Sequence, residues 1–192
     1  MNEKIKQIIT ASIDVKQQLL NDTDIQQKLV DAIDIISTAF KNDNKVLFCG
    51  NGGSAADAQH LAAEFSGRFY KDRKALPAEA LHCNTSYLTA VANDYSYDVI
   101  YARLVEGIGV KGDVLLGFST SGNSVNIVKA IESAKASEIT TIGFTGAKGG
   151  KMKKISDFIF NVPSDDTPRI QESHIMLGHV VYELVKEKVS TI

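Results

Sequence analysis

Long apolar runs are missing from this sequence, and none approaches the roughly 20 residues that a membrane-spanning helix needs. The formal net charge is only −2, so no excess of one sign favours a nucleic acid or a membrane surface as partner. The two cysteines, Cys49 and Cys83, are too few to suggest a disulfide framework, and Cys49 is expected to be a buried thiol. Residues 1–4 lead into a polar helix without the apolar core of a signal peptide. These absences favour a cytoplasmic protein.

The composition is that of an ordinary globular protein. Of 192 residues, 44% are hydrophobic and 23% are charged, and the length suffices for one core. No linker, repeat or low-complexity segment divides the chain. We therefore expect a single domain over residues 1–192, with a helical N-terminal segment over about residues 1–42.

Two amphipathic helices are predicted before any strand. Apolar residues recur at roughly helical spacing over residues 3–20, and a clearer stripe runs from Ile25 to Phe40. Asp22 or Thr23 can cap the second helix. Helices that precede the sheet have little of their own chain to cover, so we expect them to pack on a neighbouring subunit as well as on this one.

From residue 45 onward the chain repeats a pattern of apolar strand, polar turn and helix. Near-continuous apolar strands that alternate with helices are typical of a parallel sheet covered on both faces. We therefore predict an α/β fold, a three-layer α-β-α sandwich with a mostly parallel sheet, whose ligands bind at the carboxyl ends of the strands. The predicted strands are 45–49, 78–81, 113–118, 139–144 and 158–162. One predicted helix follows the first strand and ends near residue 67, and two more cover 86–92 and 98–107. Another follows the third strand and ends near residue 137, and the last runs from about 169 toward 188.

A loop rich in hydroxyl groups, residues 119–124, lies between a predicted strand and a predicted helix. The free N–H groups and the dipole of a helix N-terminus favour an anion, and four hydroxyls within six residues add donors for phosphate oxygens. The alternative is a small-residue turn in which Ser124 serves only as the N-cap. Ser and Thr are more crowded than one cap needs, which favours the anion site.

A second polar loop, residues 50–55, fits the dinucleotide-binding fingerprint with its sequence Gly-Asn-Gly-Gly-Ser-Ala. That fingerprint alone is weak, and its companion acidic residue at the end of a second strand is missing. Asp72 lies near the required distance, but inside the polar run 71–74. A polar ligand other than a dinucleotide is therefore favoured. The residues expected to approach it are Asn51, Gly52, Gly53 and Ser54.

Two pairs of residues, far apart in the sequence, carry the groups needed for metal binding or proton transfer. His60 and Glu64 are one helical turn apart and project from the same face of the helix after the second loop. Gln171 and His179 lie eight residues apart on the last helix, ~12 Å along its axis and roughly 80° around it. Gln171 and His179 could meet one ion only by reaching toward each other. Otherwise they act at different points of the site, or in different subunits.

The other histidines carry weaker signals. His174 points away from Gln171 on the last helix, and we interpret it as a surface or packing histidine. His82, at the end of a predicted strand, has no evident partner.

The chain resembles the sedoheptulose 7-phosphate isomerases, or phosphoheptose isomerases, of the sugar isomerase (SIS) domain superfamily. The resemblance spans essentially the whole chain and is most specific over residues 49–60, 117–124 and 169–174. It implies a SIS-type, flavodoxin-like fold and conversion of sedoheptulose 7-phosphate into D-glycero-D-manno-heptose 7-phosphate, the first step toward the heptose of bacterial lipopolysaccharide. It also implies a homotetramer with active sites near subunit contacts and one zinc ion per subunit.

The resemblance also implies a role for individual residues. In an enediol mechanism, Glu64 would remove the proton beside the carbonyl and His179 would move protons at the oxygens. The segment 164–168 varies within the family, so none of its side chains is assigned to the sugar. The implied zinc ligands are His60, Glu64, Gln171 and His179. The implied substrate-binding residues are Asn51, Gly52, Gly53, Glu64, Asn93, Asp94, Ser119, Thr120, Ser121, Ser124 and Gln171.

Two other functions fit part of the pattern. A non-catalytic SIS protein that regulates a partner, as the replication-initiator-associating proteins do, would share the loops but has no need of the complete set of four metal-site residues. An isomerase of a shorter sugar phosphate, such as a pentose 5-phosphate, is not excluded by loop chemistry alone. The complete set favours an enzyme over a regulator. The expected partners are a phosphorylated heptose and further copies of this chain, with no nucleic acid and no membrane.

Overall fold

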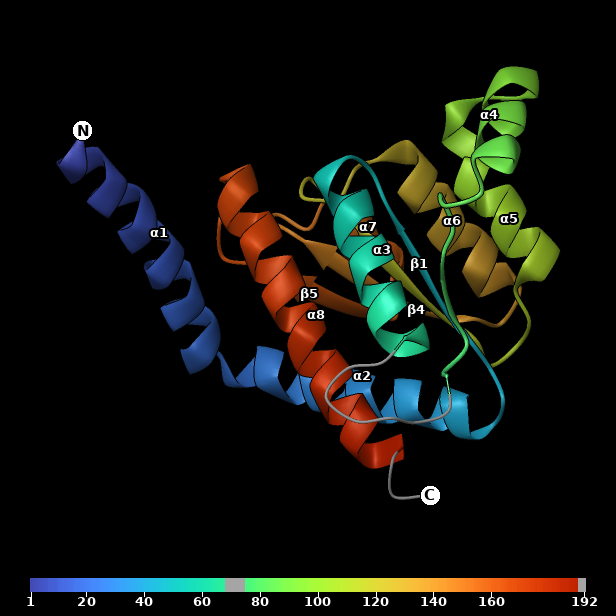
Figure 1. Cartoon of the computed structure of the whole chain (residues 1–192), viewed down its shortest axis with the longest axis horizontal. Coiled ribbons are helices and arrows are strands. Elements are labelled where there is room, and N and C mark those ends of the chain that lie inside the picture. Colours follow the sequence, from blue (N-terminus) through green and yellow to red (C-terminus); the bar gives the residue numbers. More distant parts are fainter. Residues whose placement is uncertain (68–74, 190–192) are drawn as a thin grey trace.

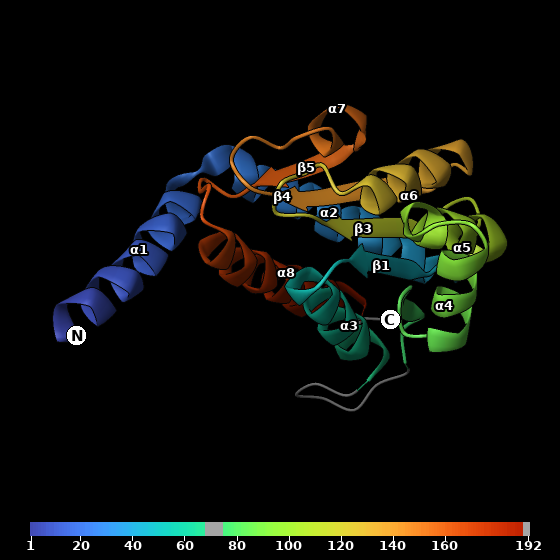
Figure 2. The ribbon, with the colours of Figure 1, turned by 90° about the horizontal axis from the view of Figure 1, so that it is seen from above.

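A computed structural model describes residues 1–67 and 75–189 of the chain (Figure 1). Its strands form one parallel sheet in the order β2-β1-β3-β4-β5. Helices cover both faces of this sheet, so the predicted three-layer α/β architecture is confirmed (Figure 2). The strands are β1 (Val46–Gly50), β2 (Ala78–Ala80), β3 (Val114–Phe118), β4 (Thr140–Thr145) and β5 (Phe158–Asn161).

The helices follow the predicted order, with two additions. The sequence pattern did not predict the single turn α7 or the short 3₁₀ helix η1. No helix within the described ranges is long and apolar enough to cross a membrane. The helices are α1 (Asn2–Asn21), α2 (Thr23–Lys41), α3 (Gly53–Ser66), α4 (Thr85–Asp94), η1 (Tyr97–Val99), α5 (Ile100–Ile108), α6 (Val125–Ala136), α7 (Met152–Ile155) and α8 (Thr167–Val189).

Each face of the sheet has its own core, because successive side chains of a strand point to opposite faces. On β1, Phe48 belongs to the core shared with α2, α3 and α8. Its neighbours Leu47 and Cys49 belong to the core shared with α5 and α6. Cys49 is buried and both cysteines are free, as predicted.

The two N-terminal helices form as expected. Asp22 is the N-cap of α2, and its Oδ1 accepts a hydrogen bond from the backbone N–H of Ile25 at 3.0 Å. Helix α1 projects away from the body of the molecule, and only Val15 and Leu19 of its residues are buried (Figure 1). Much of the apolar surface of α1 is therefore exposed.

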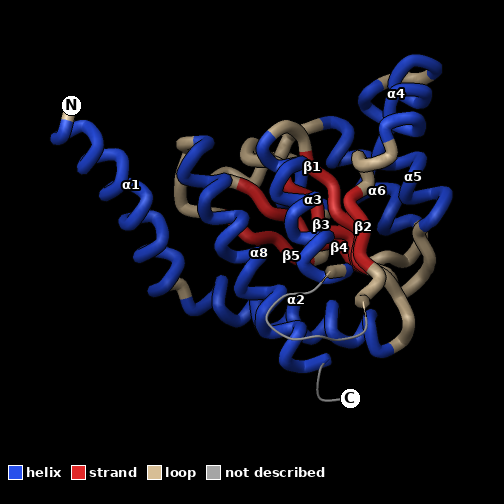
Figure 3. The backbone as a smooth tube through the Cα atoms, viewed as in Figure 1, coloured by secondary structure: helices blue, strands red, loops and turns tan. Residues whose placement is uncertain are grey.

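The strand order brings the two polar loops together. After β1 the chain crosses to β2 on one side, and it later returns to place β3 on the other side of β1 (Figure 3). Ligands of open α/β sheets bind at such a reversal of strand order. Gly50 at the end of β1 is in register with Phe118 at the end of β3. The glycine-rich loop (residues 50–55) and the hydroxyl loop (residues 119–124) therefore start side by side.

Candidate active site

Helices α3 and α8 lie side by side on one face of the sheet (Figure 1). Two glycines allow their close approach. A Cβ atom at Gly53 would lie 2.6 Å from Nε2 of Gln171, and one at Gly178 would lie 2.5 Å from Cδ1 of Leu61. The first contact joins the starts of the two helices, and the second lies farther along both. The helices therefore run parallel and bring the two predicted residue pairs together.

The chemical centre of this contact is a cluster of His60, Glu64 and His179, here called the catalytic cluster. The Nε2 atoms of the two histidines are 3.0 Å apart, and the rings meet edge to face. Oε1 of Glu64 lies 3.5 Å from Nε2 of His60, and its side chain is only 15% exposed. Two imidazole nitrogens and one carboxylate oxygen thus converge from two helices.

Gln171 lies near the start of α8, beside the start of α3. Its amide packs against Gly53, seven residues before His60 on α3. The structure brings together three of the four predicted zinc ligands. The role of Gln171 as the fourth stays a prediction.

Two donor spacings in the cluster are close to those around a zinc ion. Tetrahedral zinc with nitrogen ligands at about 2.0–2.1 Å places neighbouring donors about 3.3 Å apart. The distances of 3.0 and 3.5 Å in the cluster bracket that value. Within residues 1–67 and 75–189, however, no group of three or more His, Cys, Asp or Glu side chains is placed so that it could hold a metal ion. Two donor pairs of the cluster therefore have suitable spacings, but the cluster is not a preformed metal site.

Asp57 is a neighbour of the cluster that was not predicted. Its Oδ2 atom is buried and has no hydrogen-bond partner among the described residues. Burial raises the pKa of this carboxyl to about 6, and the nearby His60 partly opposes the shift. The available signal was helical spacing, since Asp57, His60 and Glu64 recur every three or four residues on one face of α3.

The hydroxyl loop has the arrangement expected of an anion site. Oγ of Ser119 lies 2.9 Å from Oγ of Ser124 and 3.4 Å from Oγ of Ser121. Ser124 occupies the N-cap position of α6, but its side chain makes no capping hydrogen bond. The alternative in which Ser124 serves only as a cap is therefore wrong. Its hydroxyl belongs to a group of donors at the N-terminus of α6, where the helix dipole favours phosphate.

A polar cleft of about 290 Å³ opens beside the hydroxyl loop. Nζ of Lys148 lies 3.6 Å from Oδ2 of Asp165 at this cleft, and both side chains are exposed. Asp165 and Thr167 come from the variable segment to which no contact was assigned. The structure places both at the cleft, opposite Thr120, Ser121 and Asn123 of the loop.

The glycine-rich loop is held by side chains that the sequence did not reveal. The amide of Asn51 pairs with the amide of Asn126 on α6. Oη of Tyr97 also donates to Oδ1 of Asn51, at 3.1 Å. Gly52 and Gly53 are exposed to solvent, as their predicted approach to a ligand requires. Asp72, the residue considered for dinucleotide binding, lies outside the described residues.

Three further predictions concern residues outside the cluster. Asn93 and Asp94 are exposed at the end of α4, where Asn93 donates to Asp94 at 2.9 Å, and their contact with substrate stays a prediction. His174 is fully buried against Phe118 and Phe144, with its Nε2 3.2 Å from the carbonyl oxygen of Thr145. Its interpretation as a packing residue is confirmed, and the surface interpretation is wrong.

Comparison with known proteins places this chain in a family. Residues 11–146 match the family model described as SIS domain. A phosphoheptose isomerase of Clostridium acetobutylicum is 52% identical over 188 residues, which cover 98% of this chain and 96% of that protein. The phosphoheptose isomerase of Aquifex aeolicus is 51% identical and covers 98% of each chain.

Solved structures agree with this placement. Phosphoheptose isomerase GmhA from Neisseria gonorrhoeae has a TM-score of 0.89 and 40% identity, over 96% of this chain and 98% of that one. A phosphoheptose isomerase from Francisella tularensis has a TM-score of 0.92 and 34% identity, over 96% and 97%. Fold and loops thus define a protein of the SIS domain class. Within that class, the chain belongs to the phosphoheptose isomerase family.

The buried His174 leads to a prediction about stability and pH. Burial lowers its pKa from 6.5 to about 4, and the Thr145 carbonyl only partly opposes the shift. Between these two values the unfolded chain binds more protons than the folded chain, so the stabilisation is full above pH 6.5 and is lost as the pH falls toward 4. From pH 7 to pH 4, we expect the free energy of unfolding to fall by about 3 kcal/mol more in the wild type than in His174→Gln.

Urea unfolding at a series of pH values measures this difference. Asp57, whose pKa is raised, changes stability in the opposite direction, but it does so in both proteins and cancels from the comparison. Equal pH dependence in the two proteins would contradict the assignment of His174 as a buried neutral imidazole.

Proposed function

We propose that this chain is an aldose–ketose isomerase that converts sedoheptulose 7-phosphate into D-glycero-D-manno-heptose 7-phosphate. The observation that carries the proposal is the meeting of His60 and His179 beside Glu64, in a chain 52% identical over nearly its whole length to a protein named phosphoheptose isomerase. This reaction is the first step toward the heptose of bacterial lipopolysaccharide.

The catalytic cluster supplies the groups that an enediol mechanism needs. The carboxylate of Glu64 removes a proton from C1 of the ketose and later returns it to C2. His179 donates a proton to the oxygen on C2 and accepts one from the oxygen on C1. The carbonyl thereby moves from C2 to C1, with no net gain or loss of protons. His60, in contact with both residues, holds them in position.

The hydroxyl loop holds the other end of the substrate. The phosphate is on C7, several bonds from the reacting carbons, so its site must be distinct from the catalytic cluster. The loop meets this need, because it lies at the start of α6 whereas the cluster lies on α3 and α8. Binding energy from the phosphate then positions C1 and C2 against Glu64.

We also propose one zinc ion per subunit at the catalytic cluster. His60, Glu64 and His179 would hold it, and the amide oxygen of Gln171 would complete the set. The support is that two donor pairs of the cluster, at 3.0 and 3.5 Å, have spacings close to those around tetrahedral zinc. When bound, zinc supplies electrostatic stabilisation of the charge that develops on the substrate oxygens.

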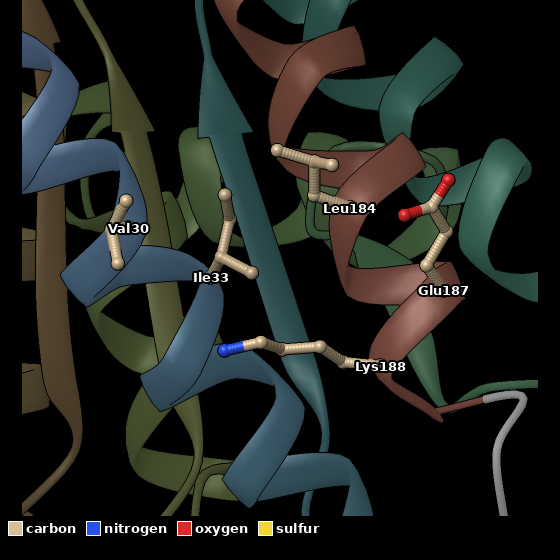
Figure 4. Close-up of a pocket in the computed structure, with 5 residues that line it drawn as sticks. All are labelled: Val30, Ile33, Leu184, Glu187 and Lys188. Carbon is tan, nitrogen blue, oxygen red and sulfur yellow. The ribbon is translucent and has the colours of Figure 1, made fainter.

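We propose further that the chain forms a homotetramer in the cytoplasm. Contiguous exposed apolar surface marks sites of protein contact. One such surface is the projecting helix α1, with exposed Ile5, Ile8, Ile9 and Ile13. A second is a pocket of about 330 Å³ between α2 and α8, lined by Val30, Ile33, Leu184, Glu187 and Lys188 (Figure 4). The two free cysteines fit the reducing cytoplasm.

Replacement of Glu64 by Gln tests the proposed base. The substitution removes the carboxylate while it keeps the size of the side chain, so the protein should fold and bind sedoheptulose 7-phosphate. Turnover should fall by at least ~100-fold, the usual contribution of a general base. Aldose formation and calorimetric binding measure the two effects. The matched control is Glu132→Gln on the exposed face of α6, and near wild-type turnover in Glu64→Gln would end the assignment.

Removal of the metal tests the zinc proposal. Elemental analysis of the purified protein, reloaded with zinc and washed, should find one zinc ion per subunit, and a chelator should lower turnover. His60→Ala and His179→Ala should each lose the bound zinc, whereas the control His82→Gln should keep it. If the wild type retains no zinc, or if His60→Ala retains as much as the wild type, the proposed site is wrong.

Charged residues on α1 test the assembly. In Ile8→Glu/Ile13→Glu, two carboxylates interrupt the exposed apolar stripe, so the protein should sediment as a smaller species than the wild type. Gln7→Glu places one charge on the opposite side of the same exposed helix and should leave the sedimentation coefficient unchanged. A monomeric wild type, or a double variant that sediments like the wild type, would refute the role of α1.

A further inference from the structure

The glycine-rich loop carries a side-chain network that the isomerase mechanism above does not use. The amides of Asn51 and Asn126 face each other, and each Nδ2 donates to the other Oδ1 at 2.9 Å. Oη of Tyr97 adds a third hydrogen bond, to Oδ1 of Asn51 at 3.1 Å. Asn126 is only 3% exposed, so water does not compete for its amide. The network joins the start of α3, the start of α6 and η1.

A backbone group fixes which way the two amides point. The N–H of Ile127 can only donate, and it is shared between Oδ1 of Asn126 at 3.0 Å and the carbonyl oxygen of Ser124 at 3.1 Å. The oxygen of Asn126 must therefore lie on that side, and its Nδ2 must face Asn51. This in turn requires that Oδ1 of Asn51 accepts from Asn126. Flipping both amides would leave the Ile127 N–H facing an NH₂ group.

A count of donors and acceptors then restricts what Asn51 can offer a ligand. An amide oxygen has two acceptor sites and an NH₂ group has two protons. Both acceptor sites of the Asn51 oxygen are occupied, by Asn126 and Tyr97. One Asn51 proton is also occupied, by the Asn126 oxygen. Asn51 therefore has one N–H donor left to offer a ligand.

We propose that Asn126 and Tyr97 are positioning residues that make Asn51 a one-proton donor toward the substrate. Asn51 then recognises a substrate oxygen with a free lone pair, in a hydroxyl, carbonyl or phosphate group, and accepts no hydrogen bond in return. This inference rests on the proposed function, in which Asn51 contacts the sugar phosphate. Because Asn126 lies in the first turn of α6, the same amide pair also fixes the distance between the glycine-rich loop and the hydroxyl loop.

A second tyrosine supports the view that this loop is held rigidly. Oη of Tyr101, four residues after Tyr97, donates to the carbonyl oxygen of Gly50 at 2.5 Å. Tyr101 is fully buried, whereas Tyr97 is half exposed at 51%. Two consecutive loop residues, Gly50 and Asn51, are thus held by tyrosines from α5 and η1. Because Tyr97 is half exposed, it can be substituted without disturbing the core.

A double-mutant cycle on kcat/KM for sedoheptulose 7-phosphate tests the inference. We expect Asn126→Ala and Tyr97→Phe each to lower kcat/KM by about tenfold, the effect of one lost net hydrogen bond. In an Asn51→Ala background both substitutions should change it by less than about twofold, because they act through Asn51. Tyr87→Phe is the matched control. It removes a tyrosine–carbonyl hydrogen bond of 2.9 Å, to Ile100, outside both loops, and should leave kcat/KM unchanged.

Full additivity in the cycle would overturn the inference, as would an equal loss in Tyr87→Phe. If Asn126→Ala does not fold, the half-exposed Tyr97→Phe variant still gives a complete cycle with Asn51→Ala. A wild type that turns over no sedoheptulose 7-phosphate would instead refute the proposed function. The pairing is then tested without substrate by urea unfolding of the same variants. Non-additive stabilities support the amide and tyrosine contacts, and additive stabilities overturn the inference whatever the enzyme acts on.

Discussion

Helices α3 and α8 approach each other closely because each presents a glycine where the other presents a side chain, and the rest of the site depends on this contact. Gly53 faces the end of the flexible Gln171 side chain, which a Cβ atom would displace, and Gly178 faces the buried Leu61, where a Cβ atom would lie 2.5 Å from Cδ1. At this separation the imidazoles of His60 and His179 come within 3.0 Å. A wider spacing would separate His179 from His60 and Glu64, which share α3, so the histidine of α8 could neither share a metal ion nor exchange a proton with them.

Much of the fold could be predicted because its sheet is buried on both faces. Each strand is a short apolar run bounded by polar residues, so the five strands were located to within two residues. β1 extends to Gly50 because that residue pairs with Phe118, a contact that the apolar run ending at Cys49 does not indicate. The single turn α7 was missed because four residues are too few to show helical periodicity.

The candidate site could be predicted only where its signal is local. The spacing of His60 and Glu64 reveals a shared helix face. Whether Gln171 and His179 meet at one ion stays a prediction. Asn126 shows no such signal, since its partner Asn51 is 75 residues away in the sequence. Ser124 was open to two interpretations because capping and anion binding use the same residue types. The structure shows that its side chain makes no capping hydrogen bond. Anion binding at this loop stays a prediction.

The central claim is that Glu64 and His179 move protons through an enediol, and solvent deuterium tests it most directly. The wild-type protein is incubated with sedoheptulose 7-phosphate in D₂O, and the aldose is examined by proton NMR. A carbon-bound proton that passes through a carboxylate exchanges with solvent during at least part of the turnovers, so the account predicts deuterium at C2 of the product. Aldose formed with no deuterium at C2 would indicate direct hydride transfer between the carbons and would contradict the account.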